Sequence, residues 1–317
     1  MEIKDYAAGD EVEILKLFQL AFGKKMPLDY WKWRFLDNPE NKVMIKLMWD
    51  NTVLAGHYAV SPVKLNVNGK LVLSALSMTT MTHPDYAGRG IFTELAEKLY
   101  DSEAIKNDLK VVWGFPNNNS HYAFVKNLKW NNLEQIPTFS ININKVKETQ
   151  PSLVKVCKAF KKEHIEAQYK TLKNYAVKVE KTIDYLTWRY LKNPTNSYVV
   201  FELLENDVLY YAVTKVFPSF EIKDTFEIDI VELVFPADLN SIQQLLQAIK
   251  NNYKEYKLLK INCWLPYNDD KHLLFEKIGF VNIAPITYSG IRILDNNYKS
   301  LQDATEWYYS MGDSDIY

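Results

Sequence analysis

The strongest constraint on the fold of this chain is an internal repeat. Residues 29–39 read DYWKWRFLDNP and residues 184–194 read DYLTWRYLKNP, so that Asp, Tyr, Trp, Arg, Leu, Asn and Pro recur at identical spacing. Two further pairs of segments are similar to a lower degree: residues 113–130 resemble residues 263–280, and residues 136–141 resemble residues 286–291. A repeat that keeps its order along the chain indicates two copies of one fold. We therefore expect two tandem domains, residues 1–150 and residues 151–317, joined by a charged helical connector over residues 152–181.

Each copy alternates between helical and strand-like patterns. In the first copy, Asp10 is placed to cap a helix whose Val12, Leu15, Phe18 and Phe22 share one face. The order of elements predicts the α/β fold class, with a mixed, largely antiparallel sheet and one crossover helix in each domain. We expect a second helix over residues 28–36, strands over 43–49, 54–60, 72–82, 111–115 and 139–143, and helices after residue 90 and over 120–127.

The composition argues against several classes of partner. The 38 basic and 39 acidic residues give a net charge of -1, whereas a nucleic-acid-binding protein normally shows a basic excess. No run approaches the roughly 18 apolar residues of a membrane span, and the amino terminus does not resemble a secretory signal. Cys157 and Cys263 stand in apolar surroundings without metal-ligand spacing, which indicates buried thiols in a reducing compartment. We therefore expect a cytoplasmic protein with no metal, no nucleic acid and no membrane partner.

The stretch THPDYAGRGIFTELAEKLY, residues 82–100, carries the clearest binding signal. The chain has only 10 glycines in 317 residues, and Gly88 and Gly90 flank Arg89 just before a helix that begins near Ile91. The first N–H groups of a helix have no intrahelical partners and face anions at the positive end of the dipole. The loop lacks the ending of a P-loop and the three-glycine spacing of a dinucleotide site. The alternative is a helix-entry turn that uses glycine for geometry alone.

The segment HPDYAGRGIFTELA resembles the acyl-CoA pyrophosphate loop of the Gcn5-related N-acetyltransferase (GNAT) superfamily. The resemblance implies coenzyme A, in acylated form, as co-substrate, with its pantetheine paired to main-chain atoms of the strand that precedes the loop. Ala87 stands where the family usually has Arg or Gln, and Phe92 where it usually has Gly or Ala. The residues that the resemblance assigns to coenzyme A are Met81 and Thr82 in the strand, Gly88, Arg89, Gly90, Ile91 and Phe92 in the loop, and Asn119 beyond the next strand.

The second copy of this loop has lost the features that favour an anion. It reads VFPADLNSIQQLL, in which Pro236 is equivalent to Pro84 and Ile242 to Ile91. It contains neither glycine nor a basic residue. If the glycines were structural, both copies would be expected to keep them. We therefore expect the first copy to bind the cofactor and the second to be a scaffold or a platform for the acceptor.

Transfer of an acyl group to an amine needs a neutral amine, donors for the oxyanion and a proton for the leaving thiolate. The resemblance assigns the oxyanion to a main-chain N–H near Thr82. Many family members use a Tyr as the acid at the position of Val125, which cannot titrate. Tyr122 and His121 are the nearest titratable residues and our catalytic candidates. His83 is a third candidate, although a structural role at the end of a strand is favoured for it.

The chain ends in EWYYSMGDSDIY, which is dense in aromatic residues. Terminal segments usually fray, and a frayed tail has little need of three adjacent aromatic side chains. We expect this tail to dock on the second domain. The carboxylates of Asp313 and Asp315 are candidates for orienting the ammonium group of an acceptor, and packing of the aromatics alone is an equal alternative.

The tandem organisation and the tail resemble GNAT proteins that N-acylate nucleotide-linked amino sugars for polysaccharide biosynthesis. That resemblance implies an acetyl or 3-hydroxybutanoyl donor, a dTDP-linked amino deoxysugar as the small-molecule acceptor and a homodimer. Two alternatives stay open. One is a tandem aminoacyltransferase that uses charged tRNA, for which the charge balance gives no support. The other is a non-catalytic protein that binds acyl-CoA.

Overall fold

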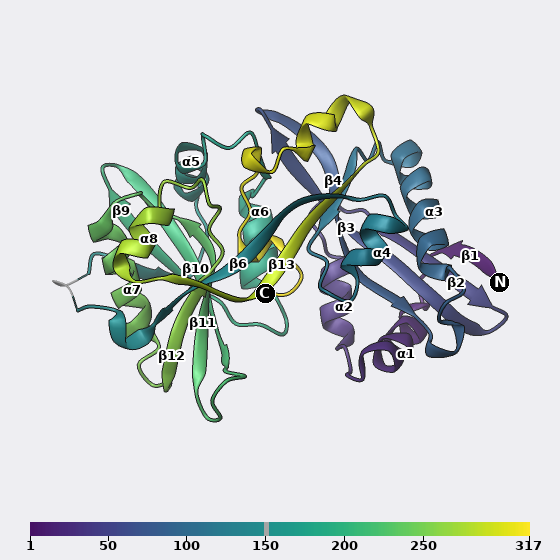
Figure 1. Ribbon diagram of the computed structural model, residues 1–317, viewed down its shortest axis with the longest axis horizontal. Helices are drawn as coiled ribbons and strands as arrows, with labels where there is room; N and C mark the ends of the chain where they lie inside the picture. The colour runs from purple at the N-terminus through teal and green to yellow at the C-terminus, as the bar shows by residue number, and fades with distance from the viewer. Residues whose placement is uncertain (149–151) are drawn as a thin grey trace. The chain divides into compact units, whose positions relative to one another are not determined.

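The computed structural model describes residues 1–148 and 152–317. The chain forms two compact units, the first made of residues 1–134 and 288–304 and the second of residues 135–287 and 305–317. This division differs from a single cut at residue 150. The boundaries fall within two strands, β6 (Asn131–Asn142) and β13 (Val281–Ile293), so each of these strands contributes to both units (Figure 1).

The sheet of the first unit has the strand order β1-β2-β3-β4-β5-β13. Neighbouring strands are antiparallel except β4 and β5, which are parallel and are joined by the crossover helix α3 (Ile91–Lys106). A parallel pair requires such a crossover. The end of β13 pairs with β5, Gly290 opposite Gly114 and Ile293 opposite Val111. The other strands are β1 (Glu2–Asp5), β2 (Met44–Asp50), β3 (Val53–Val67), β4 (Lys70–Thr82) and β5 (Val111–Gly114).

Helices cover both faces of this sheet. Alternate residues of β2 enter different cores, since Met44 and Met48 pack with α3 whereas Ile45 and Leu47 pack with α1 (Glu11–Phe22) and α2 (Leu28–Phe35). The short helix α4 (His121–Lys126) adds Phe124 to the core beneath α3. The predicted α/β class and the crossover helix are therefore confirmed.

The buried face of α1 differs from the prediction. The helix buries Ile14, Leu17 and Phe18, whereas Val12 and Phe22 are about half exposed. Asp10 makes no side-chain cap to the helix, and its carboxylate instead accepts a hydrogen bond from the N–H of Ala7. The helix has apolar residues on more than one face, and packing against β3 and β4 selects which of them is buried.

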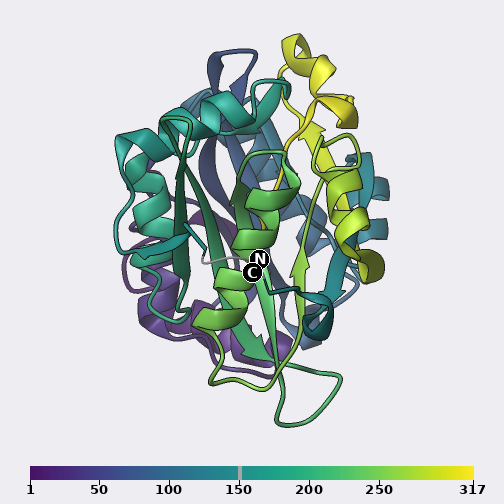
Figure 2. The ribbon, with the colours of Figure 1, turned by 90° about the vertical axis from the view of Figure 1, so that its left-hand side faces the viewer.

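The second unit repeats the same plan, which confirms the internal repeat. Its strand order is β6-β12-β11-β10-β9-β7, in which neighbouring strands are antiparallel except β11 and β12. Helix α7 (Leu239–Asn252) is the crossover between these two strands and lies in front of the sheet in Figure 2. The strands are β7 (Lys155–Cys157), β9 (Val199–Glu205), β10 (Val208–Pro218), β11 (Phe226–Val234) and β12 (Leu258–Cys263), and the helices are α5 (Lys162–Thr171), α6 (Ile183–Leu186) and α8 (His272–Ile278).

The segment expected to be a helical connector belongs to the second unit. It contains one helix, α5, flanked by the short strands β7 and β8 (Val177–Val179). The repeated Trp-Arg pair that follows is buried in both copies, as Trp33 and Arg34 in α2 and as Trp188 and Arg189 after α6.

The C-terminal tail packs into the second unit. The side chains of Trp307, Tyr308 and Tyr309 are all at most 3% exposed. Arg189 donates hydrogen bonds to the main-chain oxygens of Gly312 and Ser314. The repeated arginine of the second copy therefore fastens the tail, which no sequence pattern indicated. In the described ranges, no helix has both the length and the apolar character needed to cross a membrane.

Candidate functional site

The glycine loop of the first unit has a fixed, left-handed backbone. β4 ends at Thr82, a single 3-10 turn follows over Pro84–Tyr86, and α3 begins at Ile91. Gly88 and Gly90 have φ values of 75° and 77°, which side chains other than glycine adopt only with strain. A Cβ atom added at either glycine would meet nothing within 4 Å. The glycines are therefore needed for conformation, and the space beside the loop is open.

The loop presents a run of unpaired N–H groups. Within the described part of the chain, the main-chain N–H groups of residues 88–93 donate no hydrogen bond. The N-cap residue of α3 is Gly90, which has no side chain with which to cap them. These N–H groups lie at the positive end of a helix of 16 residues. Together they form the kind of anion site that a helix N-terminus provides.

At the equivalent helix of the second unit, a side-chain carboxylate of the protein caps the N-terminus. Asp238 is the N-cap of α7, and its side chain accepts a hydrogen bond of 3.0 Å from the N–H of Ser241. A carboxylate at this place occupies the position that an external anion would take. Of the two crossover helices, only α3 therefore has a free N-terminus.

Arg89 is held beside the loop by two contacts. Its guanidinium carbon lies 4.8 Å from the ring centroid of Tyr86, and Nη2 donates a hydrogen bond to the main-chain oxygen of Asp85. The hydroxyl of Tyr86 donates in turn to Asp50 at 2.9 Å, and this hydrogen bond raises the pKa of Tyr86. Arg89 is exposed, so it adds a positive charge at the mouth of the anion site.

A bulge in β4 precedes the loop. The pairing of β3 with β4 shifts between His57 and Ala59, and Thr79 has a φ of 52°, a strained value for a β-branched residue. His57 Nδ1 lies 2.8 Å from the main-chain oxygen of Thr79. Burial lowers the pKa of His57 to about 4, so the neutral ring donates this hydrogen bond. The sequence does not indicate this contact, because a bulge leaves no signature in the local pattern.

Beyond the bulge, β4 separates from its parallel neighbour. The ladder between β4 and β5 has its last pair at Leu76 and Trp113, whereas β4 continues to Thr82. Met81 and Thr82 thus lie on a strand segment that no longer pairs with β5. This is the arrangement expected of a strand that offers main-chain atoms to a ligand. Phe92, expected to differ from the family pattern, turns its ring into the core against Tyr58 and Phe124.

The titratable candidates lie in different surroundings. His121 stacks on Tyr288, with ring centroids 3.9 Å apart, and its Nε2 lies 2.7 Å from Asn132 Oδ1. Because Oδ1 can only accept, Nε2 carries a hydrogen, and in the neutral ring Nδ1 is the nitrogen that can accept a proton. Tyr122 is 70% exposed on α4 and is not drawn into this group.

Two further candidates make local hydrogen bonds. His83 Nδ1 accepts a hydrogen bond from the N–H of Asp85, which supports the structural role favoured for it. Asn119 is exposed, and its main-chain N–H donates to Asn117 Oδ1.

The tail acids lie in the second unit. Asp313 is 3% exposed, pairs with Lys181 at 2.9 Å and accepts a hydrogen bond from the N–H of Ser310. Its carboxylate is therefore not the free surface group that an acceptor amine would need. Asp315 is half-buried.

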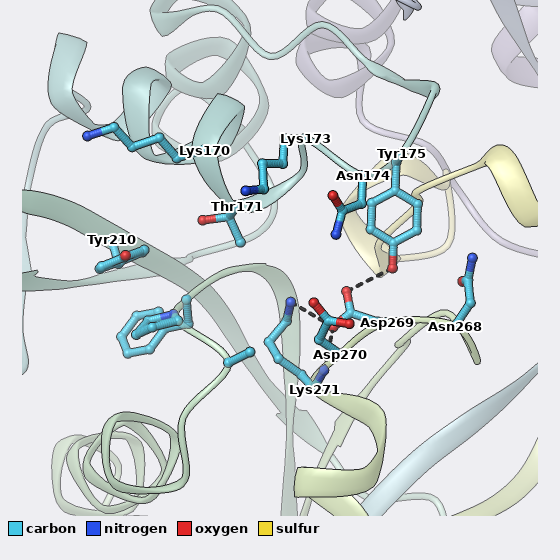
Figure 3. Close-up of a pocket in the computed structure, with 13 residues that line it drawn as sticks. Lys170, Thr171, Lys173, Asn174, Tyr175, Tyr210, Asn268, Asp269, Asp270 and Lys271 are labelled. Atoms are coloured by element: carbon cyan, nitrogen blue, oxygen red, sulfur yellow. Dashed lines mark hydrogen bonds and ion pairs between the residues drawn. The ribbon is translucent and has the colours of Figure 1, made fainter.

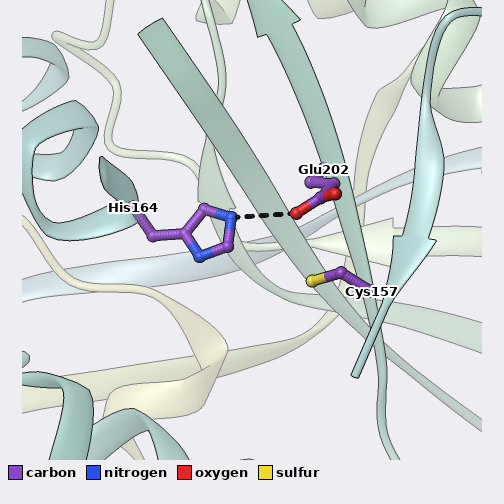
Figure 4. Close-up of side chains that lie close together, drawn as sticks. All are labelled: Cys157, His164 and Glu202. Carbon is purple, nitrogen blue, oxygen red and sulfur yellow. Dashed lines mark ion pairs between the residues drawn. The ribbon is translucent and has the colours of Figure 1, made fainter. Parts of the chain in front are cut away.

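The structure also brings Cys157 and His164 together with Glu202, which is distant from both in the sequence (Figure 4). His164 Nδ1 accepts a hydrogen bond from the N–H of Lys161, so the hydrogen sits on Nε2, which faces Glu202 at 3.4 Å. Burial raises the pKa of Cys157 to about 11, and this thiol is half-buried rather than buried as expected. A metal would need a lone pair at Nε2 and a thiolate, so these donors do not suit one.

Part of the chain, within the first unit, matches a known family. Residues 2–132 match the family described as an acetyltransferase (GNAT) domain. No protein of curated function matches the sequence.

Solved structures share the fold over nearly the whole chain. A GCN5-related N-acetyltransferase from Anabaena variabilis has a TM-score of 0.68 and 14% identity, over 93% of this chain and 73% of that one. A probable N-acyltransferase from Enterococcus faecalis has a TM-score of 0.70 and 14% identity, over 93% and 72%. Eis1 from Mycobacterium abscessus has a TM-score of 0.62 and 15% identity, over 93% and 74%. The match to the GNAT acetyltransferase domain thus covers residues 2–132, which include the free N-terminus of α3, and the solved structures share the fold of the chain.

Proposed function

We propose that the protein transfers an acyl group from acyl-CoA to the amine of a small acceptor, a dTDP-linked amino deoxysugar. The observation that carries the donor half is the run of unpaired N–H groups over residues 88–93, beside Arg89. Coenzyme A is an anion whose pyrophosphate suits such a site. The acyl group is acetyl or 3-hydroxybutanoyl, as the resemblance to nucleotide-sugar acyltransferases implies.

The residues of the first unit suit the steps of this reaction. Main-chain atoms of Met81 and Thr82, beyond the end of the β4–β5 ladder, orient the thioester arm, and an N–H near Thr82 stabilises the oxyanion. The amine nitrogen attacks the carbonyl carbon, the C–N bond forms and the C–S bond breaks. His121 accepts the amine proton at Nδ1, and Tyr122 supplies a proton to the leaving thiolate.

The acceptor half rests on resemblance and on charge. A net charge of -1 suits a small acceptor better than tRNA, so an aminoacyltransferase that uses tRNA is disfavoured. A non-catalytic acyl-CoA-binding protein is the second candidate. It is favoured by Val125, which replaces the usual tyrosine, and by the exposure of Tyr122.

A thiol-release assay tests the proposal. The protein is offered acetyl-CoA or 3-hydroxybutanoyl-CoA with a panel of dTDP- and UDP-linked amino sugars, beside the variants Gly90→Ala and Gly69→Ala. Gly69 is a matched control, because it also has a positive φ and open space around its Cβ position but lies in the β3–β4 turn.

We expect free thiol only with a dTDP-linked amino sugar, and at least a tenfold loss of rate in Gly90→Ala alone. Binding of CoA without release of thiol in the presence of any amine would favour the non-catalytic acyl-CoA-binding protein. Absence of CoA binding would refute the site itself.

A further inference from the structure

The second unit contains a cavity of about 280 Å³ that the acyl-transfer reaction does not use (Figure 3). It lies between the turn that leads from β11 to α7 and the loop that leads from β12 to α8. Its walls include Phe235, Pro236 and Ala237 from the first connection and residues 268–271 from the second. Ligands of α/β sheets bind at the carboxyl ends of neighbouring parallel strands, which is where this cavity lies.

The cavity is the second unit's counterpart of the candidate acyl-CoA site. In the repeat, Pro236 is equivalent to Pro84, and helix α7 is equivalent to helix α3. However, Asp238 caps α7, so a pyrophosphate cannot use the N-terminus of this helix. Any anion bound here must be held by side chains.

Such side chains are present on one wall. Lys170 and Lys173, at the end of α5 and just beyond it, line the cavity and are exposed, and neither has an ion pair or hydrogen bond within the described residues. In Figure 3, Lys173 lies across the cavity from Asp270 and Lys271. Two uncompensated lysines on one rim favour a dianion such as a phosphate group.

The opposite wall is rigid and rich in acceptors. The side chain of Asp269, which is 6% exposed, pairs with Lys271 at 2.7 Å and accepts a hydrogen bond from the hydroxyl of Tyr175. This pair is neutral overall. Asp270 is exposed beside it and makes no ion pair or hydrogen bond among the described residues. A free carboxylate opposite a cationic rim suits a ligand whose other end carries hydroxyl groups.

Two more groups point to a hydroxylated ligand. Thr171 lines the cavity, and its hydroxyl oxygen is buried without a hydrogen-bond partner among the described residues. Buried polar atoms are seldom left unpaired, so a ligand or water is expected there. Tyr210 presents a half-buried aromatic ring, the kind of surface on which the C–H face of a sugar packs.

We propose that this cavity binds a sugar phosphate, with the phosphate on Lys170 and Lys173 and the sugar hydroxyls on Thr171 and Asp270. The volume lies just below the range usual for drug-sized ligands, roughly 300–1,000 Å³, so a single sugar phosphate fits whereas a whole coenzyme A does not. The site is independent of the glycine loop and of the acyl-transfer reaction.

Isothermal titration calorimetry of the full chain with glucose 1-phosphate, without any CoA, tests this proposal. The double variant Lys170→Ala/Lys173→Ala is expected to bind at least tenfold more weakly. The matched control Lys254→Ala/Lys257→Ala, which removes two exposed lysines of the same unit outside the cavity, is expected to bind within twofold of the parent. Inorganic phosphate and glucose are each expected to bind at least tenfold more weakly than glucose 1-phosphate.

The variant Thr171→Val tests the sugar half separately. It is expected to weaken glucose 1-phosphate binding several-fold and to leave the weak binding of inorganic phosphate unchanged. No binding of glucose 1-phosphate, or equal binding in the lysine double variant, would overturn the proposal. Equal affinity for inorganic phosphate would overturn the sugar class. Binding should persist in Gly90→Ala, so failure of the acyl-transfer proposal would not be mistaken for failure of this one.

Discussion

At the scale of single residues, the positive φ values of Gly90 and Gly69 separate the cost of backbone strain from the loss of binding. An alanine at either position must adopt a left-handed backbone, which costs about 1 kcal/mol of unfolding free energy. We expect both variants to lose this amount in urea denaturation. Only Gly90→Ala should also weaken the binding of CoA in calorimetry. Equal affinity for CoA in the two variants would show that the loop does not hold the anion.

His57 makes the stability of the first unit depend on pH. Its pKa is lowered from about 6.5 in the unfolded chain to about 4 by burial, so the unfolded state binds more protons between these values. Stability is therefore lost as the pH falls from about 6.5 towards 4, by about 3 kcal/mol at most.

The variant His57→Asn keeps an N–H donor for the oxygen of Thr79 but does not titrate there. Its unfolding free energy, measured by urea denaturation from pH 7.5 to 4.5, should fall less steeply than that of the parent. If the unfolding free energies of the two proteins fell equally with pH, His57 would not be the group responsible for the pH dependence.

At the scale of elements, the caps of the two crossover helices predict different responses to substitution. Asp238→Ala removes the hydrogen bond to the N–H of Ser241 and should cost about 1 kcal/mol in thermal or urea unfolding. Glu255→Ala, at an exposed residue beyond the end of α7, is the control and should be nearly neutral. A neutral Asp238→Ala would indicate that water replaces the cap without loss.

Much of the element pattern could be predicted from the sequence. The helix over residues 28–36 and the crossover helix after Gly90 are confirmed, with Ile91, Leu95 and Leu99 buried. The buried face of α1 could not be predicted, because its apolar residues allow more than one buried stripe and packing against the sheet determines which of them is buried. The pairing of β13 with β5 joins strands that are far apart in the chain, and no local pattern encodes such a contact.

Only the local part of the candidate site could be predicted from the sequence. The glycine loop is local, so its residues could be read from the sequence. The hydrogen bond from His57 to Thr79 and the His121–Tyr288 stack depend on tertiary packing, and neither spacing nor composition reveals them.

At the scale of the whole molecule, the docked tail depends on buried charges. Lys181 binds both Glu232, at 2.6 Å, and Asp313, at 2.9 Å, and all three are at most 3% exposed. Lys181→Met leaves two buried carboxylates unpaired and should cost 3–5 kcal/mol, roughly, in urea denaturation.

Lys178→Met is the matched control for this change. Lys178 is also buried, but among the described residues its ammonium group donates only to a main-chain oxygen, that of Tyr175, so its loss should cost about 1 kcal/mol. Similar losses in the two variants would contradict the role assigned to the Lys181 cluster.

The exchange of β13 and β6 between the units has a consequence for how the protein is made. The first unit requires residues 288–304, so its edge strand emerges only after residues 135–287 have been synthesised. Until then β5 keeps an open edge, which is a site for wrong pairing. A gene for either half alone would encode an incomplete sheet, so the duplication is no longer divisible into two working copies.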